Sequence, residues 1–193
     1  MGRPSLVAKR TTEILDAFER CVARFGIEGS SLDRIAEEAR MQRSILRHYV
    51  GNREDLVRAL AQRVIAKYEA SFTTHLEDTG HLSPVEQLMT HLFPSKVVST
   101  TQSLLVVEAL IAASATSVDI REQMRGYVDG VIERSAGLLK REYPSASRQR
   151  CWAVAYGVVS ICFNHESLSP IEPPPKYRRA AKEAARVLIQ TLG

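Results

Sequence analysis

Four arginines stand close together in the segment ARMQRSILRHYVGNREDL, residues 39–56. They occupy positions 40, 43, 47 and 53, and no acidic residue falls between the first and the last of them. An arginine carries a permanent positive charge on a planar fork of N–H donors. That fork bonds a phosphate group, or the O6 and N7 atoms of a guanine together. The chemistry open to this segment is therefore the binding of anions and of base edges.

The apolar residues of the same segment predict a short helix, from about Gln42 to His48, that presents this charge outward. Positions are assigned to its two sides at about 100° per residue. The inner side holds Met41, Ile45, Leu46 and Tyr49. The outer side holds Arg43, Ser44 and Arg47. One side of this helix is thus expected to pack on the protein and the other to face a partner.

Two further helices are predicted in front of it. In TTEILDAFERCVARFGI, residues 11–27, Ile14, Phe18, Cys21 and Phe25 recur at helical spacing, and Gly26 is typical of a helix end. SSLDRIAEEA, residues 30–39, opens a second helix with either Ser30 or Ser31 as its cap. Three helices with a tight turn before the last predict a helix-turn-helix, whose second helix enters the DNA major groove.

A solvated cationic helix face is the simpler explanation of a charge run. Three features favour DNA instead. The second and third predicted helices have the lengths and the order that a helix-turn-helix requires. Their apolar positions suit one small three-helix core. Further cations stand where phosphates would lie, namely Arg53 at a helix start and a basic N-terminal arm with Arg3, Lys9 and Arg10.

The segment also resembles the N-terminal signature of the TetR family of bacterial transcriptional regulators, approximately T-x-x-x-I-A-x-x-A-G-V-S-x-x-x-L-Y-x-H/Y-F-x-x-K-E-x-L. The matching positions are Ser31, Ile35, Ala36, Ala39, Leu46, Tyr49, Arg53, Glu54 and Leu56. The resemblance covers about residues 10–58. It implies a DNA-binding domain over residues 1–52 and a helical domain for effector binding and dimerisation over residues 53–193.

The resemblance also assigns roles to single residues. It implies phosphate contacts for Ser31, Tyr49 and Arg53, and base contacts for Arg43, Ser44 and His48. Gln42 completes this set at the position of the family's serine. Arg47 replaces a tyrosine that helps to bind phosphate, so it either binds phosphate more strongly or reaches a base. Arg40 replaces the turn glycine and must avoid or tolerate a left-handed backbone.

The rest of the chain predicts helices only, which gives an all-α fold of about nine helices. Helix starts are expected at Ser83-Pro84, with an end at Pro94, and at Thr116 with Asp119, with an end before Pro144. TTQSLLVVEALIAAS, SRQRCWAVAYGVVSICFNHESL and KYRRAAKEAARVLIQTL supply three more helices. The last two carry small-residue and aromatic faces. These faces either form a homodimer as half of an intersubunit four-helix bundle or pack within one chain.

The leading functional hypothesis is a DNA-binding repressor that a small apolar ligand releases from a near-palindromic operator on double-stranded DNA. Trp152 and Tyr156 are the candidate ligand contacts, although an aromatic stripe is more often core. One alternative is a ligand-independent or architectural DNA-binding protein. The other is a small helical enzyme, which the five histidines disfavour because they show no HExxH or similar spacing.

The amino-acid composition indicates which partners and which cellular compartment are compatible with these hypotheses. The net charge of +4 and the pI near 9.1 are compatible with an anionic partner. The three cysteines stand in apolar stretches without a CxxC pair, which predicts buried thiols in a reducing compartment. The longest uncharged apolar run is shorter than the roughly 20 residues that span a bilayer. We therefore expect a cytoplasmic protein with no membrane partner, no cofactor and no metal.

Overall fold

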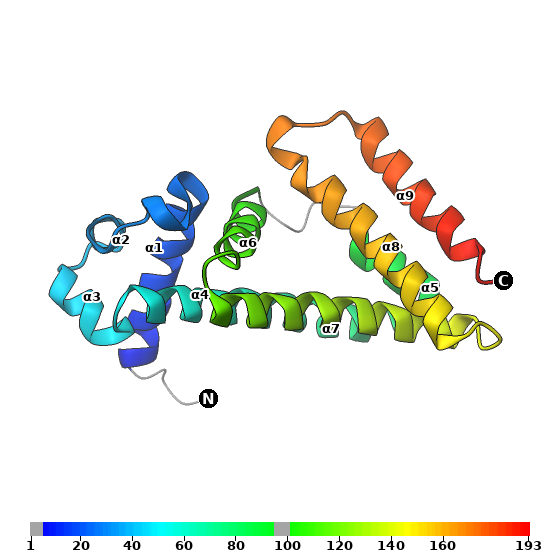
Figure 1. The fold of residues 1–193 in the computed structure, drawn as a ribbon, viewed down its shortest axis with the longest axis horizontal. Coiled ribbons are helices and arrows are strands. Elements are labelled where there is room, and N and C mark those ends of the chain that lie inside the picture. Colours follow the sequence, from blue (N-terminus) through cyan, green and yellow to red (C-terminus); the bar gives the residue numbers. More distant parts are fainter. Residues whose placement is uncertain (1–5, 95–100) are drawn as a thin grey trace. The chain divides into compact units, whose positions relative to one another are not determined.

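The computed structural model describes residues 6–94 and 101–193, and within these ranges helices joined by turns are the regular structure (Figure 1). Its α-helices are α1 (Leu6–Gly29), α2 (Leu32–Glu38), α3 (Arg43–Val50), α4 (Arg53–Asp78), α5 (Pro84–Leu92), α6 (Thr101–Ala113), α7 (Val118–Glu142), α8 (Arg148–Ser167) and α9 (Pro175–Gln190), with a short 3-10 helix at Ser169–Ile171. The predicted all-α fold of about nine helices is confirmed. Arg3 of the basic arm lies outside the described residues.

The helices form two compact units. Among the described residues, the first unit comprises 6–67 and 101–124, and the second comprises 68–94 and 125–193. Helices α4 and α7 each contribute residues to both units. The boundary predicted between residues 52 and 53 separates the expected DNA-binding domain from the expected effector domain, and it differs from the division into two packed units. This domain boundary stays a prediction.

Helix α1 is the centre of the first unit and contacts α2, α3 and α6. Its Ile14 and Phe18, one helical turn apart, are fully buried, and so are Ile35 of α2 and Leu46 of α3. These residues form the small three-helix core that the apolar spacing predicted. Burial of such side chains typically stabilises a fold by about 1.5–3 kcal/mol each, so this core holds α3 firmly in place.

Serine hydroxyls cap several helix starts. At α2 the cap is Ser31, whose Oγ accepts a backbone N–H at 3.2 Å. Ser30, the other candidate, is buried and donates its hydroxyl to a carbonyl of α1 at 2.6 Å. Ser83 caps α5 as predicted. At α7 the capping hydroxyl belongs to Ser117, so the expected start at Thr116 was one residue early.

The second unit has its own apolar core between α5, α7, α8 and α9. Its fully buried members include Leu88, Met89, Leu139, Val158 and Ile189. Helices α8 and α9 approach closely at Gly157, where a Cβ atom would lie 2.5 Å from Cδ2 of Leu188. The small residues of α8 therefore serve packing within the chain at this point.

Across the described residues, no helix combines the length and the apolar character that a membrane span requires. Cys21, Cys151 and Cys162 are buried free thiols, as predicted.

Candidate nucleic-acid interface

Helix α3 is anchored through one side and exposed on the other. Leu46 and Val50, one turn apart, are buried against the core of the first unit. The outer residues Arg43, Ser44, Arg47 and His48 are all exposed. The predicted outward orientation of Arg43, Ser44 and Arg47 is confirmed, and His48 shares this exposed side.

Two residues predicted to face inward lie at the surface. Ile45 is 41% exposed. The short helix α3 packs on the protein through the side that holds Leu46 and Val50, and Ile45 lies outside that side. Phe25 near the end of α1 is also exposed, with the guanidinium groups of Arg24 and Arg34 centred 5.6 and 4.8 Å from its ring. Cations over an aromatic face are a favourable surface arrangement. Helical spacing alone was therefore a poor guide to burial at these two positions.

The turn between α2 and α3 contains Arg40 with a left-handed φ of 53°. The N–H of Arg40 bonds the carbonyl of Glu37 at 3.0 Å, and the N–H of Met41 bonds that of Ala36 at 2.9 Å. This pair of bonds is a Schellman motif, in which glycine usually takes the left-handed position. The arginine therefore tolerates the strained conformation and places one more cation beside the start of α3.

A concavity of about 550 Å³ opens where the start of α1 meets the start of α3. Its polar lining consists of Arg10, Arg40, Gln42, Ser44, His48 and Tyr49. Leu6, Met41 and Ile45 supply its apolar part. Gln42 occupies the N-cap position of α3 without using its side chain as a cap, so its amide is available to a partner. Cations, an amide and a phenol around one hollow provide donors for a phosphate backbone.

Two of the predicted DNA contacts already have partners within the protein. Arg43 donates Nη1 to both carboxylate oxygens of Asp33, at 3.1 and 2.9 Å. Arg53 donates Nη1 to the carbonyl of Ser30 at 2.6 Å and Nη2 to the carbonyl of Ile27. Arg53 thus bridges the turn between α1 and α2, and its phosphate contact stays a prediction.

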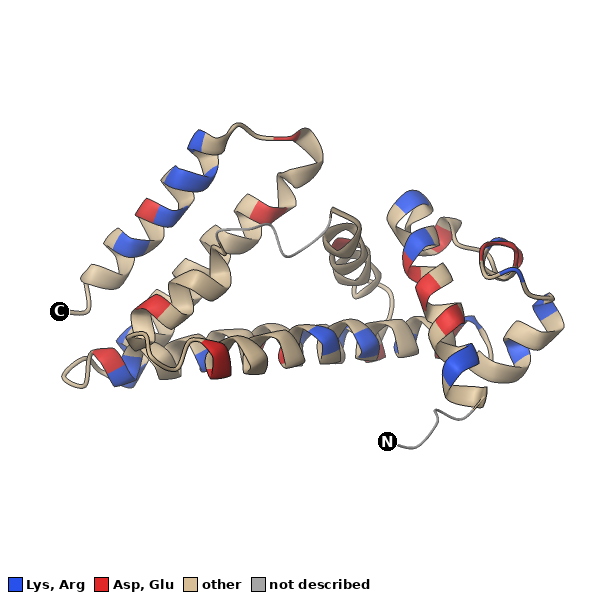
Figure 2. Ribbon diagram, turned by 180° about the vertical axis from the view of Figure 1, so that it is seen from behind, with Lys and Arg blue, Asp and Glu red and all other residues tan. Residues whose placement is uncertain are grey.

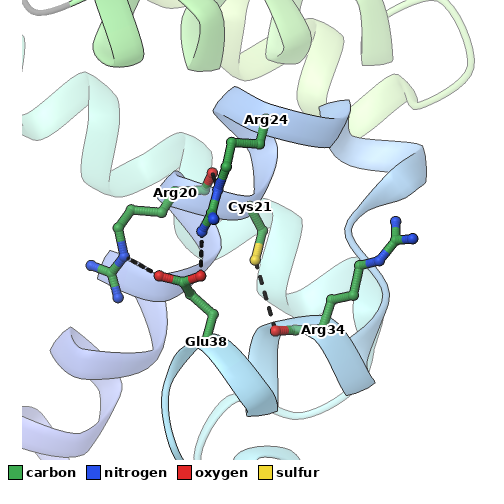
Figure 3. A network of polar contacts seen from close by, with 5 residues as sticks. All are labelled: Arg20, Cys21, Arg24, Arg34 and Glu38. Atoms are coloured by element: carbon green, nitrogen blue, oxygen red, sulfur yellow. Dashed lines mark hydrogen bonds and ion pairs between the residues drawn. The ribbon is translucent and has the colours of Figure 1, made fainter.

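A polar network joins α1 to α2 within the first unit (Figure 3). Arg20 donates Nε to Glu38 at 2.6 Å, and Arg24 donates to the other oxygen of the same carboxylate. These two hydrogen bonds, the one from Arg20 first, lower the pKa of Glu38. Burial raises the pKa of the Cys21 thiol, whose Sγ lies 3.9 Å from the carbonyl of Arg34. The residues of this network come from two helices, so the sequence pattern of either helix does not reveal it.

The charges of the first unit are unevenly placed (Figure 2). Helix α3 carries Arg43 and Arg47 and has no Asp or Glu, whereas the neighbouring α2 carries Asp33, Glu37 and Glu38. Within the part of the chain that the structure describes, no acidic partner pairs with Arg47. The cationic side of α3 is consequently the strongest feature for an anionic partner.

The predicted ligand contacts lie on the surface of the second unit. Trp152 is 39% exposed and Tyr156 is 53% exposed, and their rings stack with centroids 5.8 Å apart and planes 7° apart. Their role as ligand contacts stays a prediction.

A histidine cluster that the sequence did not reveal lies in the second unit. Nε2 of His75 lies 3.0 Å from the carbonyl of Gln87, and the rings of His75 and His91 are 5.1 Å apart. Burial, with smaller contributions from electrostatic interaction with His75 and Arg134, lowers the pKa of His91 to about 4. Within the described chain, Nε of Arg134 is buried without a hydrogen-bond partner. These polar groups gather beside an apolar core, an arrangement common in small-molecule sites.

Comparison with known families links residues 14–60 to a family profile described as "Bacterial regulatory proteins, tetR family". The match includes α2, α3 and the start of α4. No curated protein sequence matches the chain.

Several solved structures share the fold over nearly the whole chain. A TetR-like transcriptional regulator from Rhodococcus sp. RHA1 is 24% identical, with a TM-score of 0.74 and 97% of each chain covered. A TetR transcriptional regulator from Legionella pneumophila is 14% identical, with a TM-score of 0.79 and coverage of 96% of this chain and 98% of that one. The multidrug binding protein EbrR, solved with imidazole, is 22% identical, with a TM-score of 0.63 and coverage of 93% and 94%. At these identities the likeness establishes the fold.

Proposed function

The chain belongs to the TetR family of bacterial regulatory proteins through its helix-turn-helix, and from this premise we propose that it is a repressor released from a near-palindromic operator by a small apolar ligand. It acts as a cytoplasmic regulator rather than an enzyme. Its DNA-binding surface comprises Ser31, Gln42, Arg43, Ser44, Arg47, His48, Tyr49 and Arg53.

The observation that carries this proposal is the outer side of α3. Arg43, Ser44, Arg47 and His48 are exposed on a helix whose opposite side is anchored by Leu46 and Val50. A recognition helix needs this combination, because base edges are read by side chains held rigidly in the major groove. Ser31 supports the proposal from α2, since its Oγ accepts the capping bond and leaves the hydroxyl proton free for a phosphate.

Dimerisation through the last two helices is supported by apolar side chains at the surface of the second unit. Trp152 and Tyr156 of α8 are exposed, as are Tyr177 and Val187 of α9. Exposed apolar groups of this size on adjacent helices are typical of a protein interface. A two-fold dimer would present one recognition helix to each half-site, which makes the operator a near-palindrome.

The effector proposal rests on the second unit. Its apolar core adjoins His75, His91 and Arg134, which offer a few polar groups to a mostly apolar ligand. That EbrR was solved with imidazole supports a small-molecule site in this fold. Helix α4 continues from Arg53 into this unit, so a ligand that favours one position of α4 would shift the recognition helices. A coupling of about 1–3 kcal/mol suffices for a 5- to 150-fold loss of DNA affinity.

Selection of bound sites from random duplex DNA with the full chain tests the DNA-binding part. We expect a near-palindromic site, and failure to enrich any sequence would remove the regulator proposal. Small molecules that raise the melting temperature are then titrated against the selected duplex. If tightly bound molecules leave DNA affinity unchanged, the ligand-independent regulator replaces the repressor.

A further inference from the structure

Asp33 and Arg43 meet on the outer surface of the helix-turn-helix. Asp33 belongs to the first turn of α2, and Arg43 is the first residue of α3. Nη1 of Arg43 contacts both carboxylate oxygens, at 3.1 and 2.9 Å. The two side chains are 69% and 53% exposed.

The stability of the fold does not explain the ion pair between Asp33 and Arg43. Ion pairs between exposed side chains contribute little to folding, because water and salt screen the attraction and both side chains lose freedom. The pair also occupies the place where a recognition helix first meets the bases, since its N-terminal residues contact base edges. A role in recognition explains the placement better than a role in folding.

The geometry leaves one edge of the Arg43 guanidinium open. Only Nη1 is bonded to Asp33, and no other hydrogen bond joins this side chain to the described residues. The Nε and Nη2 hydrogens remain as a parallel pair of donors. Such a pair matches the O6 and N7 acceptors that guanine presents in the major groove.

We propose that Asp33 is a positioning residue that orients Arg43 to read one guanine in each half-site, an inference that rests on the proposed DNA-binding function. The carboxylate fixes the rotation of the guanidinium and offsets its charge. If Arg43 moved to a phosphate instead, Asp33 would stand unpaired beside the DNA polyanion, which repels it. The pair therefore favours base reading over backbone binding.

The test repeats the selection from random duplex DNA with Arg43→Ala, Asp33→Asn and Asp33→Glu. Arg43→Ala should lose the guanine preference at one position of each half-site, by about 5- to 150-fold. Asp33→Asn should weaken the preference at that same position. It should also strengthen binding to unrelated DNA and steepen the salt slope by about one unit, because the released Arg43 reaches a phosphate. Asp33→Glu, which keeps the carboxylate, should restore much of the preference.

Glu37→Gln is the matched control, because it removes the same charge from the same short helix. It should leave every base preference intact, and thermal unfolding should show all variants folded. If the wild type selects a site and Asp33→Asn changes neither the preference nor the salt slope, the positioning role is wrong while the regulator proposal stands. A flatter salt slope in Arg43→Ala with all preferences intact would also overturn it, by making Arg43 a phosphate contact. If the wild type selects no site, both proposals fall together.

Discussion

The guanidinium of Arg53 lies 2.6 Å from the carbonyl oxygen of Ser30, so the first residue of α4 holds the turn that precedes α2. A second bond from the same group reaches the carbonyl of Ile27. These two carbonyls follow the left-handed Gly26, where α1 is interrupted and its last turn begins. Arg53 thereby joins the start of α4 to the last turn of α1 and to the turn before α2 through one side chain.

Replacing Arg53 by Ala should lower the free energy of unfolding by about 2 kcal/mol, because two charge-assisted hydrogen bonds disappear. Arg53→Lys should recover only part of this loss, since one ammonium group cannot reproduce the planar fork. Urea denaturation measures both effects, with Arg47→Ala as the exposed control expected to change stability by less than about 0.5 kcal/mol. Unchanged stability in Arg53→Ala would show that its hydrogen bonds to Ser30 and Ile27 do not hold this turn.

Replacing Arg40 by Gly should stabilise the protein by about 1 kcal/mol. The φ of 53° at this position is sterically unfavourable for a residue with a Cβ atom, whereas glycine adopts it without this strain. Arg40→Ala is the control, because it removes the charge and the long side chain but keeps the Cβ atom. If Ala and Gly stabilise equally, side-chain effects rather than backbone strain account for the change.

Stability should fall as the pH drops from about 6.5 toward 4. The pKa of His91 is lowered by burial from 6.5 to about 4 in the folded protein, so the unfolded chain binds its proton first. The contribution of His91 is therefore complete above pH 6.5. It falls by about 2 kcal/mol by pH 5 and by about 3 kcal/mol by pH 4.

Urea unfolding of the wild type and His91→Leu at pH 7.5, 6 and 5 isolates this contribution from that of the carboxylates. The wild type should lose more stability than the variant over this range. Parallel pH dependence in the two proteins would show that His91 is not the titrating group.

A charge placed on the exposed aromatic surface of α8 should abolish the proposed dimer. Tyr156→Asp puts a carboxylate where we expect an apolar contact with a second chain, and Val187→Asp does the same on α9. Light scattering at micromolar concentration should detect a monomer for either variant and a dimer for the wild type. Ile111→Asp, at an exposed apolar position of α6, is the control that should remain dimeric. Dimers in all four proteins would locate the interface elsewhere.

The sequence by itself determined the helices and the outward side of the recognition helix. Helical spacing of apolar residues places Leu46 inside and Arg43 and Arg47 outside. A serine or proline at the start of a helix predicts where that helix begins to within a residue or two. These features depend on neighbours a few residues apart. They are therefore readable without knowledge of the rest of the fold.

Only the tertiary structure decided what the exposed and half-buried polar groups touch. Arg53 meets carbonyls more than twenty residues earlier in the chain, and Asp33 reaches Arg43 across the turn between two helices. The packing of α6 on α1 and the meeting of His75 with His91 likewise join separate helices. Ile45 is an apolar residue whose exposure was likewise decided by the tertiary structure. Its apolar character favours burial, but no described helix covers it. Such contacts depend on how the helices pack against one another, and local periodicity carries no information about that packing.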